Sequence, residues 1–112
     1  MAQKTGSTYP LAVLFNSECC GVPDSKPLLN YIKSFKKKNK LKAITAYRIG
    51  PMGKEGEYHL AFPLKELDKR RTLLFTNGVK AVAATMKDKG NAQVEENYIV
   101  PFAGKSCLKQ RL

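Results

Sequence analysis

The sequence predicts an α+β fold in which helices cover a sheet. Short runs rich in strand-forming residues and segments with apolar residues at helical spacing follow one another in the order strand, helix, strand, strand, helix, strand. Glycine, proline and aspartate separate them. The length of 112 residues suits one domain with one core, and a hydrophobic content of 43% excludes wholesale disorder.

The first half of the chain predicts a central strand followed by a helix. Residues 9–16 (YPLAVLFN) are apolar on both faces, as expected for a strand inside a sheet. Asp24 or Ser25 can cap a helix over residues 25–39. Three large apolar residues recur there at helical spacing and should face the core: Leu28, Ile32 and Phe35.

The second half predicts a hairpin, a helix and a last strand. Residues 41–49 and 57–62 are strand-like and flank a loop with three glycines. Asp68 can cap a helix over 68–87, and residues 93–100 alternate well enough for a strand. The buried stripe of the second helix is expected to contain Leu74, Gly78, Val82 and Met86, with Phe75 and Val79 widening it.

This element order is that of the ferredoxin-like fold, a βαββαβ arrangement. It predicts a four-stranded antiparallel sheet in the order 4-1-3-2 with both helices on one face. We expect residues 9–102 to form the domain, between a flexible tail over 1–8 and a polar tail over 103–112. Many unrelated activities share this fold, so it does not indicate a function.

Positive charge is the strongest indication of a partner. Twenty Lys and Arg residues against nine Asp and Glu residues give a net charge of +11, which attracts RNA, DNA or another polyanion at long range. The alternative is that these lysines form only a solvated helix face. The helix dipole favours lysines in the last turn, whereas repulsion between like charges at i, i+4 disfavours them, so the two effects roughly cancel. The predicted polyanion-binding residues are Lys33, Lys36, Lys37, Lys40, Lys69 and Arg70.

The cysteines offer a second candidate site. Cys19, Cys20 and Cys107 are an odd number without the spacing of a disulfide framework, so reduced thiols are expected. Cys19 and Cys20 lie in the loop after the first strand, where Lys54 and Lys89 should be near enough to favour a thiolate or bind an anion. Ferredoxin-like metal carriers hold ligands in this loop through Cys-x-x-Cys, and the adjacent pair departs from that spacing. We therefore expect either one reactive thiol or two inert ones, and predict no metal site.

The single histidine does not predict catalysis. His59 lies in a strand-like segment without the spacing of a catalytic triad, so a solvated position on the open sheet face is expected. RNA-recognition domains of this fold stack bases on aromatic residues of that face. In the register that we expect, Tyr58, Phe62 and Tyr98 face the helices instead, which removes such a stacking platform.

The sequence thus predicts a cytoplasmic binding domain with no cofactor and no catalytic residue. The expected partner is a polyanion, with RNA first. The alternatives are a thiol-based redox or metal site at Cys19 and Cys20, and a domain that associates with another protein or with itself. No apolar run approaches the roughly 20 residues of a membrane helix, so no membrane partner is expected.

Overall fold

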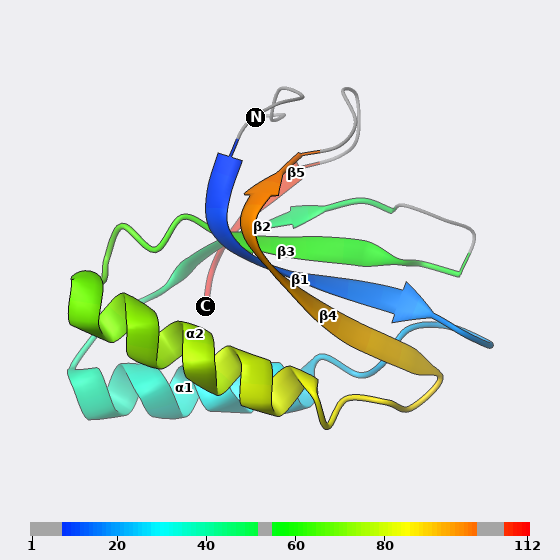
Figure 1. The fold of residues 1–112 in the computed structure, drawn as a ribbon, viewed down its shortest axis with the longest axis horizontal. Helices are drawn as coiled ribbons and strands as arrows, with labels where there is room; N and C mark the ends of the chain where they lie inside the picture. Colours follow the sequence, from blue (N-terminus) through cyan, green and yellow to red (C-terminus); the bar gives the residue numbers. More distant parts are fainter. Residues whose placement is uncertain (1–7, 52–54, 101–106) are drawn as a thin grey trace.

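The computed structural model describes residues 8–51, 55–100 and 107–112. A bent sheet lies on two helices that run side by side beneath it (Figure 1). Every strand pair in the sheet is antiparallel, and the strand order is β4-β1-β3-β2-β5. The elements are β1 (Thr8–Ser17), α1 (Lys26–Asn39), β2 (Thr45–Ile49), β3 (Tyr58–Phe62), α2 (Lys69–Ala83), β4 (Gly90–Ile99) and β5 (Cys107–Arg111).

The α+β class is confirmed, but the expected four-stranded sheet is wrong. Residues 107–111, which we expected in a polar tail, form a fifth strand that pairs with β2 from Ile49↔Cys107 to Thr45↔Arg111. The segment CLKQR has no apolar run to predict a strand. It pairs because the edge of β2 offers unpaired backbone groups, and charged side chains are common on edge strands.

The main core lies between the helices and one face of the sheet. Alternate residues of β1 point into it, and the three residues expected from α1 are buried there. The stripe expected over residues 68–87 is confirmed only in part: Phe75, Val79 and Met86 are buried, whereas Leu74 is 50% exposed. The core-facing side of α2 is therefore centred on Phe75 and Val79 rather than on Leu74 and Gly78. The buried residues of α2 are Phe75, Thr76, Val79 and Ala83.

A glycine sets the contact between the two helices. A Cβ atom at Gly78 of α2 would overlap the hydroxyl and ring of Tyr31 on α1. The Tyr31 hydroxyl donates to the backbone carbonyls of Leu74 and Phe75, each at 3.4 Å. Gly78 therefore lets a tyrosine fill the space where the helices meet.

Within the described residues, neither helix is long and apolar enough to cross a membrane.

A second, smaller cluster lies on the opposite face of the sheet. Asn97 of β4 has φ 54°, and this left-handed residue interrupts the alternation of side chains along the strand. Tyr98 consequently joins this cluster, and our prediction that it faces the helices is wrong. Tyr58 and Phe62 do belong to the main core, as expected. The cluster consists of Tyr9, Ala12, Ile49, Ala61, Tyr98 and Val100.

Candidate nucleic-acid interface

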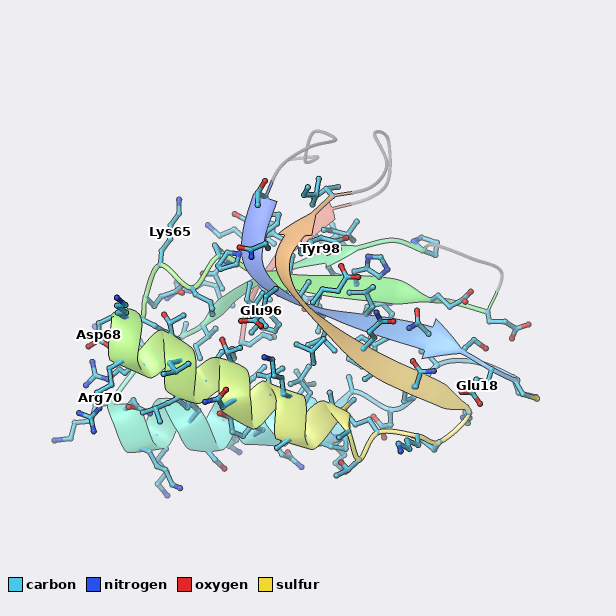
Figure 2. The ribbon with its side chains drawn as sticks, in the orientation of Figure 1. Glu18, Lys65, Asp68, Arg70, Glu96 and Tyr98 are labelled. Carbon is cyan, nitrogen blue, oxygen red and sulfur yellow. A yellow bond between two sulfur atoms is a disulfide. The ribbon has the colours of Figure 1, made fainter. Side chains whose placement is uncertain are left out.

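The antiparallel packing of the helices brings two basic segments together. The end of α1 meets the start of α2, where the Arg71 Nε donates to the Asn39 Oδ1 at 3.2 Å across 32 residues of sequence. Figure 2 shows Lys65 and Arg70 at this end of the molecule and Glu18 at the opposite end. All six predicted polyanion-binding residues are exposed except Lys36, which is half-buried. We call them the basic end: Lys33, Lys36, Lys37, Lys40, Lys69 and Arg70.

Helix caps hold the basic end in place. Lys40 adopts a left-handed conformation with φ 54° and closes α1 through its backbone N–H to the carbonyls of Lys36 and Lys37. At the start of α2, the Asp68 carboxylate accepts the backbone N–H of Arg71 at 2.8 Å. The same carboxylate lies 3.7 Å from the Arg71 guanidinium, so it pairs with a cation outside the six.

The charge of this end comes from side chains rather than from the helices. The C-terminus of α1 carries about half a negative charge and the N-terminus of α2 about half a positive charge. Because the two termini are neighbours, these partial charges largely cancel. Six cationic side chains then dominate the local potential, and a polyanion is the ligand that such a surface attracts.

A further cationic group was not predicted from the sequence. A hollow of about 380 Å³ beside the β2–β5 pair is lined by residues that include Lys42, Lys109 and Arg111. One acid, Glu66, also lines it, and its Oε2 accepts the backbone N–H of Thr45 at 3.1 Å. Two of the three cations belong to β5, so this edge hollow depends on the unexpected strand. The alternation of Lys109 and Arg111 is the feature that could have indicated it.

An apolar groove of about 300 Å³ adjoins the basic end. It lies between α1 and Leu112, whose backbone N–H and carbonyl both pair with Ile44, at 2.9 and 3.0 Å. These two hydrogen bonds hold Leu112 beside α1. The groove is lined by Leu29, Ile32, Lys33, Lys36 and Leu112. Two members of the basic end therefore also form its wall.

The cysteine pair differs from the expected free thiols, because the structure joins the sulfur atoms of Cys19 and Cys20 in a disulfide. The adjacent side chains can meet because the backbone turns sharply here, with positive φ at two successive residues: Cys20 has φ 68° and Gly21 has φ 124°. The turn is anchored by the Cys19 N–H, which donates to the Lys89 carbonyl at 2.9 Å. Both cysteines are exposed.

One member of the predicted thiol group, Lys54, cannot be placed, and neither can the side chain of the third cysteine, Cys107. Lys54 and the side chain of Cys107 lie outside the described residues. Within the described part of the chain, no three His, Cys, Asp or Glu side chains gather as metal ligands would. The thiol group that the structure places is thus Cys19 and Cys20 with the backbone of Lys89.

His59 is half-buried rather than solvated as expected. Its Nδ1 lies 2.6 Å from the Tyr98 hydroxyl, a contact that joins β3 to β4 over the intervening β1. Ala12 of β1 and Ala61 of β3 are paired on the same face of the sheet, and their small side chains leave room for the His59 and Tyr98 rings. Burial lowers the pKa of His59 below its ordinary value of 6.5. The pair thus connects two strands that are not neighbours in the sheet.

Comparison of the chain with protein-family models, with curated proteins and with solved structures found no match in any of the three. The function must therefore be inferred from the surface itself.

Proposed function

We propose that this protein binds RNA through the basic end, where lysine and arginine side chains contact phosphate groups. The observation that supports the proposal is the pairing of the two helices, which brings the end of α1 beside the start of α2, so that basic segments distant in the sequence become neighbours with mostly exposed side chains. With a net charge of +11, the whole molecule favours approach to a polyanion. An RNA partner also fits the cytoplasmic location that the sequence suggests.

Salt dependence measures this kind of binding. Each phosphate contact made by a cation releases counterions and adds about 0.7 to the slope of log affinity against log salt for a single strand, or about 0.9 for a duplex. The four lysines of α1 in the basic end would thus contribute up to about 3 to the slope for a single strand. A bond between uncharged groups would not show such a slope.

The experiment compares two variants with the same loss of charge. One replaces the four lysines of α1 in the basic end by glutamine: Lys33, Lys36, Lys37 and Lys40. The control replaces four lysines near the start of α1 and toward the end of α2 or beyond it: Lys26, Lys80, Lys87 and Lys89. Lys80 pairs with Glu96 at 2.9 Å on the surface, and such exposed pairs add little to stability.

We expect the first variant to bind RNA more weakly than the control, with a salt slope lower by up to about 3. Thermal unfolding of both variants should stay near that of the wild type. Equal weakening by the two variants would show that only total charge matters and would refute the assignment to the basic end. Absence of binding by the wild type at about 50 mM salt would remove the function itself.

The turn at Cys19 and Cys20 supports a second candidate function, thiol–disulfide exchange. The reduced pair would give two electrons and two protons to a small-molecule disulfide, forming the Cys19–Cys20 bond and releasing two small thiols. The special turn and the exposure of both residues favour this reaction. Mass spectrometry after alkylation, with and without the oxidant, would test it. Two alkylated residues at this turn under both conditions would exclude the exchange.

A further inference from the structure

The apolar groove beside the basic end combines apolar and cationic side chains. Leu29 on its rim is 39% exposed, whereas Ile32 at its base is 1% exposed. Lys33 and Lys36 line the same groove and belong to the basic end. An apolar slot therefore lies directly beside cations that can hold phosphates.

A duplex cannot use this arrangement. Its bases are stacked and paired inside the helix, so its outer surface offers phosphates and groove edges to the protein. In a single strand the bases can turn outward, and each base has a flat apolar face beside a phosphate. The groove likewise places apolar side chains next to cationic ones.

We propose that the groove between α1 and Leu112 holds a base of single-stranded RNA while Lys33 and Lys36 contact the neighbouring phosphates. This inference rests on the proposed function and adds the class of RNA. Because the apolar residues of the groove are aliphatic, the base packs against Leu29 and Leu112 through its face, with no side-chain pattern that reads its edge. The preference is accordingly for a single strand over a duplex, without strong sequence specificity.

The test compares three probes of equal length at about 50 mM salt: a single-stranded oligouridine, an RNA duplex, and an abasic strand with the same number of phosphates. Fluorescence anisotropy gives each affinity. Leu29→Gln changes the groove without changing charge. Leu73→Gln is the matched control, since Leu73 lies on α2 and is 63% exposed.

We expect the wild type to bind oligouridine about five- to tenfold more tightly than the abasic strand, the factor for covering roughly 50 Å² of apolar surface. Leu29→Gln should bring the ratio of the two affinities close to 1, whereas Leu73→Gln should leave it at the wild-type value. The salt slope should be the same for both variants, because neither change touches a cation.

Two results separate the failure of this inference from the failure of the proposed function. Equal affinity for oligouridine and the abasic strand, or a ratio unchanged by Leu29→Gln, would overturn the groove while leaving RNA binding at the basic end intact. Absence of binding to all three probes would overturn RNA binding itself, and the groove with it. Tighter binding of the duplex than of oligouridine would also overturn the groove.

Discussion

Replacing Gly78 by alanine should destabilise the protein, although alanine is the better helix former. In an open helix this change would stabilise the fold by about 1 kcal/mol. Here the new methyl group would overlap the ring of Tyr31, which must leave its place between the helices. Burial raises the pKa of Tyr31 above its ordinary value of 10.0, so its hydroxyl remains a neutral donor to higher pH than an exposed tyrosine would.

The size of the effect follows from what the ring contacts. Displacing it breaks two long hydrogen bonds to α2, together worth about 1 kcal/mol. It also removes ring contacts with Phe35 and Phe75, at centroid distances of 6.1 and 5.8 Å, worth about 1–2 kcal/mol together. Against the gain from alanine, the net loss is about 1–2 kcal/mol in the free energy of unfolding.

A double-mutant cycle measured by urea unfolding tests this reasoning. In a Tyr31→Ala background the obstacle is gone, so Gly78→Ala should stabilise the protein by up to about 1 kcal/mol. The sign of the effect should thus reverse between the two backgrounds. The same change in both backgrounds, or a gain in the wild type, would refute the close approach of the helices at Gly78.

Two further predictions concern the sheet. A Cβ atom at Gly90 would overlap the backbone carbonyl of Asn16 on the paired strand, so Gly90→Ala should lower the unfolding free energy by about 1–3 kcal/mol or more, as urea unfolding would show; an unchanged midpoint would contradict that contact. The lowered pKa of His59 means that the unfolded chain takes up a proton at higher pH than the folded chain, so stability should fall as the pH drops through 6.5. His59→Gln should weaken this dependence between about pH 7.5 and about pH 5.5, and an identical pH profile for both proteins would disprove it.

Periodicity in the sequence was enough to place both helices and four strands. Leu28, Ile32 and Phe35 are buried as their spacing predicts, because they form one continuous apolar stripe of α1, whereas Leu29 lies beside that stripe and is 39% exposed. On α2, apolar residues occupy two neighbouring stripes, and spacing alone cannot choose between Leu74 and Phe75. The choice depends on Tyr31, which belongs to the other helix.

The remaining differences come from backbone conformation and from pairing between distant segments. Nothing in the sequence around Asn97 requires a left-handed residue, yet that residue turns Tyr98 to the opposite face. Likewise, the lysines of the basic end could be singled out from the sequence, but the approach of the end of α1 to the start of α2 depends on helix packing. The edge hollow depends on β5, whose pairing is set by the free edge of β2.

Backbone amide chemical shifts recorded by NMR during titration with oligouridine at about 50 mM salt would test RNA binding at the basic end most directly. The account predicts that the shifted amides belong to residues 33–40 and 69–71, together with Leu29 and Leu112 at the groove. Amides of the opposite end, at residues 19–21 and 86–90, should stay in place. Shifts confined to that opposite end, or no shifts at all, would contradict the account.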